Sequence, residues 1–175
     1  MDVDADGFLD LFAVQNLLEV NPLIERFGSG RGLLLVGDGT GKFQLPEIDG
    51  GVVVRGAGRS ATTVDLNSDG RCDLVAATSG DGFKFFANKS RHVPFAIDMR
   101  QASEGKSYLG AKVILTFVDG SQQLHQITSN SGYLSQSAPI VYSGLKNNKE
   151  VDTIRIDWPD GSTQTGSVNS LLRNR

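Results

Sequence analysis

Two nine-residue acidic segments with one shared pattern constrain this chain more than any other feature. Residues 2–10 read DVDADGFLD, and residues 65–73 read DLNSDGRCD. Each segment has an oxygen-bearing side chain at positions one, three, five and nine, and a glycine at position six. Alternate side chains of a short loop can turn to the same side, and glycine permits the sharp turn that brings them together. Each segment therefore predicts a tight loop whose oxygen atoms face one centre.

Calcium is the occupant that these loops predict. Ca²⁺ takes six to eight oxygen ligands at about 2.3–2.6 Å, and a backbone carbonyl at position seven extends the alternating set. Without a cation the carboxylates would repel one another, and we expect too few neighbouring Lys and Arg residues to neutralise them. A solvated Asp-Gly turn explains one such segment, but two full matches favour metal binding. The predicted ligands are Asp2, Asp4, Asp6, Phe8 (carbonyl) and Asp10 in the first loop, and Asp65, Asn67, Asp69, Arg71 (carbonyl) and Asp73 in the second loop.

The residues that follow each loop argue against a helical calcium site. An EF-hand needs a bidentate Glu at position twelve and a helix on each side. Position twelve is Ala13 in one case and Ala76 in the other, and residues 11–14 and 74–77 are strand-like. Asp10 and Asp73 must therefore close the loops, which we place on β-hairpins.

The spacing of the loops predicts an all-β fold built from repeated units. The first ligands of the two loops are 63 residues apart, and a unit of that length with several short strands is typical of a β-propeller blade. The chain has 21 glycines and only 7% aromatic residues, and no segment keeps a helical spacing of apolar residues over several turns. Residues 1–92 are therefore predicted to form two repeats of a truncated propeller.

A closed propeller needs at least four blades, so further blades are expected to lie outside this chain. The strand that should lead into the first loop is also missing, which predicts that the chain is part of a longer protein.

From about residue 93, longer alternating strands replace the acidic loops. Residues 111–118 and 122–128 flank an Asp-Gly turn, and residues 151–158 and 162–165 flank a Pro-Asp-Gly turn. Asp-Gly between two alternating strands is a strong hairpin signal. Residues 93–167 are therefore predicted to form a small β-sandwich-like domain, and residues 168–175 a tail.

The two halves resemble two known families. The acidic loops, each followed by a strand, and the turn GDGTGKF at residues 37–43 resemble FG-GAP or VCBS repeats of integrin-like β-propellers. The segments GAKVILTF (110–117), SGYLSQSAP (131–139) and VDTIRIDWPDGSTQ (151–164) resemble the ASPIC/UnbV domain. The resemblance covers nearly the whole chain, and it implies an extracellular or exported protein with calcium in the repeats and no catalytic role. Asn67 stands where the pattern has a carboxylate, so we expect the second site to be the weaker one.

These observations lead to one functional hypothesis and two alternatives. The leading hypothesis is a calcium-stabilised extracellular module of the interaction or adhesion type, with a protein or glycan as its ligand. The alternatives are a non-catalytic accessory region of a larger exported enzyme and a purely structural spacer.

Other functional classes find less support in the residues. The formal net charge of −3 and the scattered Lys and Arg argue against a nucleic-acid partner, and the apolar runs are too short to insert into a membrane. The glycines of residues 37–41 do not make a phosphate loop, because Val36 stands where its first glycine should be and Phe43 where Ser or Thr should be. His92 and His125 lie in unrelated contexts, away from any nucleophile motif, so we expect no enzymatic activity.

Three further features allow two readings each. Residues 131–137 (SGYLSQS) form either a recognition loop or a structural turn whose hydroxyls bind backbone groups. Trp158 is either a ligand platform or a core residue. Asn88, with Lys89 and Ser90, forms a glycosylation acceptor if the chain passes through a eukaryotic secretory pathway.

Overall fold

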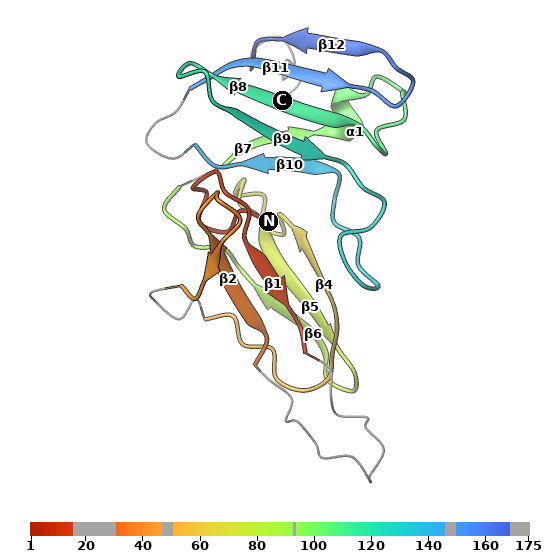
Figure 1. Ribbon diagram of the computed structural model, residues 1–175. Coiled ribbons are helices and arrows are strands. Elements are labelled where there is room, and N and C mark those ends of the chain that lie inside the picture. Colours follow the sequence, from red (N-terminus) through yellow and green to blue (C-terminus); the bar gives the residue numbers. More distant parts are fainter. Residues whose placement is uncertain (16–30, 47–50, 93, 146–149, 169–175) are drawn as a thin grey trace.

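The structure is a computed structural model that describes residues 1–15, 31–46, 51–92, 94–145 and 150–168. Over these ranges the chain forms several small antiparallel sheets and one short helix, and none of these sheets closes into a barrel. The predicted all-β class is therefore confirmed. Figure 1 shows the sheets in two groups, one built from residues before position 93 and one from residues after it. We call these groups the N-terminal half and the C-terminal half.

The N-terminal half contains two three-stranded sheets. The first has the order β1-β2-β3, with β1 (Leu11–Ala13), β2 (Leu33–Gly37) and β3 (Phe43–Gln44). The second has the order β4-β5-β6, with β4 (Gly58–Val64), β5 (Asp73–Thr78) and β6 (Gly82–Phe86). Strands β1 and β5 are the ones that follow the two acidic loops, as the repeat predicts.

The C-terminal half contains a two-stranded and a four-stranded sheet. Strand β7 (Phe95–Asp98) runs into helix α1 (Met99–Ala102) and pairs with β10 (Ile140–Ser143). The larger sheet has the order β12-β11-β8-β9, with β8 (Lys112–Phe117), β9 (Gln122–Gln126), β11 (Val151–Asp157) and β12 (Thr163–Gly166). Both predicted hairpins form, and their turn glycines Gly120 and Gly161 adopt φ angles of 80° and 85°.

The main apolar core lies in the C-terminal half. Alternate residues of β8 and β11 turn inward against β7, β10 and α1, which gives the sandwich-like packing that the alternation predicts. Trp158, only 4% exposed, belongs to this core, and Lys106 Nζ lies 5.5 Å from its ring centre. Val168, the first residue of the predicted tail, also packs against the core, and residues 169–175 lie outside the described residues.

The N-terminal half buries less apolar surface. Its fully buried apolar residues are mostly small, namely Ala5, Val54, Ala57, Cys72, Leu74 and Ala76. An open groove of about 790 Å³ lies between its two sheets and is lined by residues of β2, β5 and β6, among them Val36, Leu74 and Phe86. The buried apolar part of this half is therefore smaller than the core of the C-terminal half.

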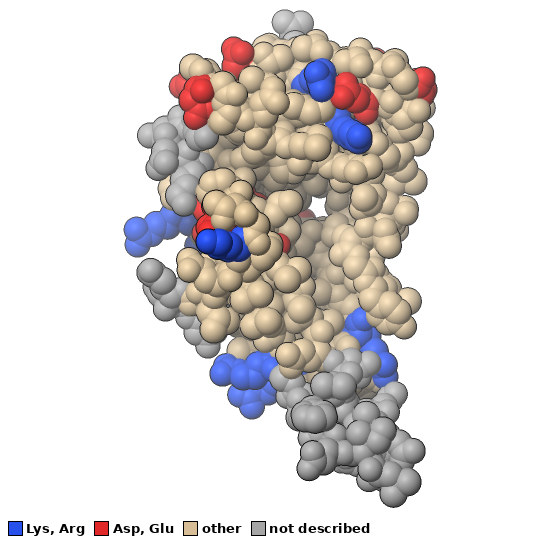
Figure 2. Space-filling view, viewed as in Figure 1, with Lys and Arg blue, Asp and Glu red and all other residues tan. Residues whose placement is uncertain are grey.

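Charge and hydropathy of the described residues are unremarkable on the large scale. The one short helix found there is neither long nor apolar enough to cross a membrane. On the face seen in Figure 2, Lys and Arg occur in separate small groups and form no stripe.

Candidate metal centre

The second acidic loop joins β4 to β5 and is held by its own carboxylates. Asp65 accepts hydrogen bonds from the backbone N–H groups of Asp69 (3.1 Å) and Gly70 (2.9 Å). The Asn67 Oδ1 accepts from the same Asp69 N–H at 3.1 Å, and Asp69 accepts from Arg71 N–H at 2.9 Å. The side-chain oxygens at positions one, three and five therefore accept hydrogen bonds from backbone N–H groups of the loop itself.

The first loop repeats this arrangement bond for bond. Asp2 accepts from the N–H groups of Asp6 (3.0 Å) and Gly7 (2.9 Å), Asp4 accepts from Asp6 (3.2 Å), and Asp6 accepts from Phe8 (2.9 Å). Met1 pairs with Asp10 through backbone hydrogen bonds, as Val64 pairs with Asp73 in the second loop. The two segments are therefore one structural motif occurring twice.

Backbone angles show why the shared sequence pattern is needed. Gly7 and Gly70, at position six, have φ angles of 92° and 81°, which only glycine adopts readily. Position four is also left-handed, with φ of 58° at Ala5 and 60° at Ser68. The sequence predicted the turn at position six but contained no signal for the one at position four.

The aspartate at position nine ties each loop to a neighbouring strand. Asp10 accepts from Val3 N–H at 2.6 Å and from Gly37 N–H, at the end of β2, at 3.0 Å. Asp73 accepts from Leu66 N–H at 2.9 Å and from Asn88 N–H, after β6, at 2.7 Å. Both carboxylates are buried. The prediction that these two residues close the loops agrees with this geometry.

Three carboxylates of the first loop come close together. One oxygen each of Asp2, Asp4 and Asp10 lie within 4.8 Å of one another. Asp6 is not part of this trio; it is held by Phe8 N–H instead. Burial raises the pKa of Asp2 to about 6 and also raises the pKa of Asp10, since both are removed from water with another carboxylate nearby.

The second loop has less excess negative charge than expected. Arg71 Nη1 lies 3.3 Å from Asp69 Oδ2, and Asn67 Nδ2 donates to the same oxygen at 3.0 Å. The hydrogen bond from Arg71 N–H is the main cause that lowers the pKa of Asp69. Arg71 thus pairs with one of the carboxylates for which we expected too few neighbouring cations, because the side chain at position seven folds back over position five.

Asn88 links the two loops and was missed as a structural residue. Its Nδ2 donates to the carbonyl of Val3 in the first loop at 2.8 Å and to the carbonyl of Cys72 in the second at 3.2 Å. A glycan on this amide nitrogen would replace one of its two hydrogens and therefore one of these two hydrogen bonds. The sequence singled out Asn88 only as a glycosylation acceptor, and no local pattern indicated the bridge.

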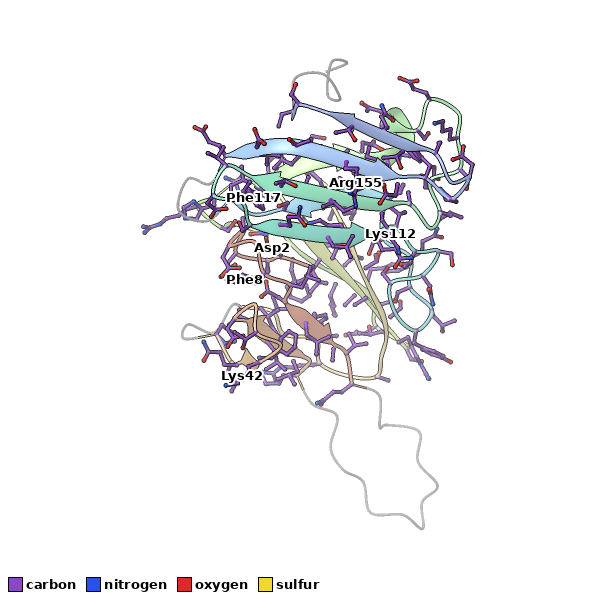
Figure 3. The ribbon with its side chains drawn as sticks, turned by 45° about the horizontal axis from the view of Figure 1, so that its top comes forward. Asp2, Phe8, Lys42, Lys112, Phe117 and Arg155 are labelled. Atoms are coloured by element: carbon purple, nitrogen blue, oxygen red, sulfur yellow. The ribbon has the colours of Figure 1, made fainter. Side chains whose placement is uncertain are left out.

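The first loop also contacts the C-terminal half. Gly144 N–H donates to Asp2 Oδ2 at 2.8 Å, and Gln123 Nε2 donates to the carbonyl of Gly7 at 2.9 Å. Figure 3 shows Asp2 at the boundary between the halves, beside the four-stranded sheet, with Phe8 farther away. The sequence contained no signal for Gly144 or Gln123.

Residues 131–137, the serine loop, bind the outer edge of β4. Ser135 Oγ accepts from Ala61 N–H at 3.1 Å, and Ser137 Oγ accepts from Thr63 N–H at 3.2 Å. Thr62 Oγ1 donates to the carbonyl of Gln136 at 2.7 Å. These hydroxyls bind backbone groups that the edge strand would otherwise leave unpaired, which favours the structural reading of this segment.

Comparisons with known proteins agree with the division into two halves. Residues 2–76 match the FG-GAP-like repeat, and residues 101–170 match the ASPIC and UnbV family. The chain is 28% identical to human cartilage acidic protein 1 over 172 residues and 29% identical to the mouse protein over 174 residues, which is 93% and 94% of this chain. The chain is homologous to cartilage acidic protein 1. The resemblance inferred from the motifs is thereby confirmed.

The matched relatives are much longer than this chain. The aligned region is 23% of the human and mouse cartilage acidic proteins, and 19% of the protein from Xenopus tropicalis, which is 27% identical over 132 residues. The chain thus spans less than a quarter of the length of the curated relatives that it matches.

Proposed function

We propose that this chain is a calcium-stabilised extracellular interaction module, in which calcium has a structural role in both acidic loops. The FG-GAP-like match and the homology to cartilage acidic protein 1 support a repeat module outside the cell. A protein or glycan is the proposed ligand of the module, and no catalytic role is assigned to any residue.

The close trio of Asp2, Asp4 and Asp10 is the observation that carries this proposal. Two oxygens bound to one Ca²⁺ at about 2.5 Å can be at most about 5 Å apart. The 4.8 Å limit on the oxygens of this trio meets that requirement. Hard carboxylate oxygens are the donors that Ca²⁺ prefers, and magnesium would demand a more regular and smaller cage.

The second loop is proposed as a weaker site of the same kind. Its hydrogen bonds match those of the first loop, but Asn67 replaces the carboxylate of Asp4. Asp69 is also shared with Arg71, so less negative charge remains for a cation. Ligand charge tunes the affinity of calcium loops, which orders the two sites by strength.

Bound calcium would add stability to the N-terminal half, whose apolar core is small. A cation held by position-one and position-nine side chains would fasten each loop to the strand that follows and offset the repulsion between buried carboxylates. Two ions would change the formal net charge from −3 to about +1. The added positive charge near the loops would then change the electrostatic interaction of this surface with charged partners.

A melting experiment tests the metal dependence. We expect the melting temperature of the chain to rise with free calcium and to fall in chelator. For dissociation constants on the order of 0.1–1 mM, 10 mM calcium should add about 1.4–2.7 kcal/mol per site.

Asp4→Ala combined with Asp69→Ala is the matched control, because it removes one predicted ligand from each loop and keeps Asp10 and Asp73, which accept hydrogen bonds from Gly37 and Asn88. The double variant should melt at the same temperature in calcium and in chelator. Identical melting of the unmodified chain in both buffers would contradict the proposal.

A further inference from the structure

The two acidic loops differ in one respect that their sequences do not reveal. Among the described residues, the carboxylate of Asp65 is held by Asp69 and Gly70, which belong to its own loop. The carboxylate of Asp2 has the equivalent two bonds and a third one from Gly144 N–H, 142 positions away in the chain. The first loop is therefore completed by the C-terminal half, whereas the second loop is complete within the N-terminal half.

A second residue of the C-terminal half reinforces this contact. Gln123, on β9, donates through Nε2 to the carbonyl of Gly7, and its Oε1 accepts a hydrogen bond from Ser143 Oγ. Ser143 is 1% exposed and directly precedes Gly144. The side chain of Gln123 thus connects the tip of the first loop to the backbone that carries the Gly144 donor.

The fit between the halves is too close for a side chain at position 144. A Cβ atom added to Gly144 would overlap the backbone of Ala5 and lie 2.5 Å from Asp2 Oδ2. A Cβ atom added to Gly7 would lie 2.6 Å from Gln123 Nε2 and 3.0 Å from the Gly144 carbonyl. Glycine at 144 is therefore needed for space, so that its N–H can reach the carboxylate.

We propose that Gln123 and Gly144 are positioning residues for the first calcium loop, so that calcium bound there and docking of the two halves stabilise each other. This rests on the proposed calcium function. Groups that orient a metal ligand through hydrogen bonds commonly change metal affinity by about 10- to 100-fold. Asp2 is the ligand concerned, and two backbone N–H groups on its Oδ2, one from each half, fix its direction. Linkage requires the effect to be reciprocal: what strengthens docking strengthens calcium binding, and calcium in turn strengthens docking.

Calorimetric titration of the full chain with calcium tests this proposal, with the affinity of each site measured separately. Asp69→Ala weakens calcium binding at the second loop, so that the affinity of the first loop can be measured. Asp4→Ala weakens calcium binding at the first loop, so that the affinity of the second loop can be measured. In the Asp69→Ala background, Gly144→Ala should weaken calcium binding about tenfold or more, and Gln123→Ala should weaken it severalfold. In the Asp4→Ala background, neither change should alter the affinity of the second loop.

Gln122→Ala is the matched control. It removes the neighbouring glutamine of the same strand, whose side chain is exposed and donates to Thr116 Oγ1 at 3.1 Å on the sheet itself. This variant should leave both calcium affinities unchanged. Because Gln123→Ala creates no clash, it tests the proposal even if Gly144→Ala fails to fold.

Hydrogen exchange supplies a readout that does not depend on affinity. Calcium should slow exchange of Gly144 N–H in the Asp69→Ala chain and leave it unchanged in the Asp4→Ala chain. If the first loop binds calcium equally well with Gln123→Ala and Gln122→Ala, the coupling between the halves is refuted while the proposed function stands. If neither background binds calcium, both proposals fail.

Discussion

At the scale of single residues, the environment of Asp2 controls how the first loop behaves without a cation. The carboxylate is only 4% exposed, and its desolvation raises its pKa above the ordinary 3.8 to about 6. Asp69, which occupies a solvated position beside Arg71, has a lowered pKa instead. Two aspartates of one repeated motif thus differ because burial raises the pKa of Asp2, whereas the hydrogen bond from Arg71 N–H is the main cause that lowers the pKa of Asp69.

Replacing Asp2 by Asn should change how stability depends on pH in calcium-free buffer. A carboxyl with a raised pKa binds its proton more tightly in the folded chain, so its stabilising effect is complete below about pH 4 and is lost as pH rises through 6. The unmodified chain should therefore gain stability relative to Asp2→Asn as pH falls from 7 to 4, by at most about 3 kcal/mol. Urea unfolding of both chains at several pH values measures this. A difference that stays constant with pH would show that Asp2 does not titrate in this window.

At the scale of elements, strand β4 has a covered edge because the serine loop binds it. The N–H groups of Ala61 and Thr63 point away from β5 and are accepted by Ser135 and Ser137. Exposed strand edges invite pairing with other chains, so hydroxyls at this edge also protect the sheet from association. A turn in the C-terminal half thereby completes a sheet in the N-terminal half.

Ser137→Ala should weaken this contact. Ser137 Oγ interacts with Thr63 N–H, Thr63 Oγ1 and Ser131 Oγ, and its loss leaves a backbone donor of the edge strand without a partner. We expect a loss of about 1–2 kcal/mol in the free energy of unfolding and faster hydrogen exchange at Thr63. Thr163→Ala, at an exposed position of β12, serves as a control and should leave Thr63 exchange unchanged. Unchanged exchange at Thr63 in Ser137→Ala would mean that the serine loop does not bind this edge in solution.

At the scale of the whole molecule, the two halves differ in what holds them together. The C-terminal half has a continuous core that includes Leu115, Ile154 and Ile156, each fully buried. The N-terminal half has small buried residues and two acidic loops, in the first of which Asp2, Asp4 and Asp10 come close together. Burial of apolar surface is independent of calcium, whereas the loops are the part that a cation would stabilise.

Chelator should therefore affect the halves unequally. In excess EDTA, backbone N–H groups of β5 and β6 should exchange markedly faster than in 10 mM calcium, while those of β8 and β11 should change little. Hydrogen–deuterium exchange followed by mass spectrometry of peptides from each half makes this comparison. Equal acceleration in both halves would indicate that the chain unfolds as a single unit and that its core does not act independently.

The sequence by itself determined the features that depend on neighbouring residues. The spacing of Asp2, Asp4, Asp6 and Asp10 around Gly7 predicted the loop, because ligand alternation and a glycine turn are local properties, and three of these four carboxylates, without Asp6, come close together. Alternating strands and Asp-Gly turns likewise predicted the hairpins of the C-terminal half. Only the tertiary structure decided that Gly144 completes the first loop, that Asn88 bridges the two loops and that the serine loop covers β4. Except for the bond from Asn88 to Cys72, 16 positions away, these contacts join residues 74 to 142 positions apart, and a glycine or serine that makes such a contact looks the same in the sequence as one that only turns the chain.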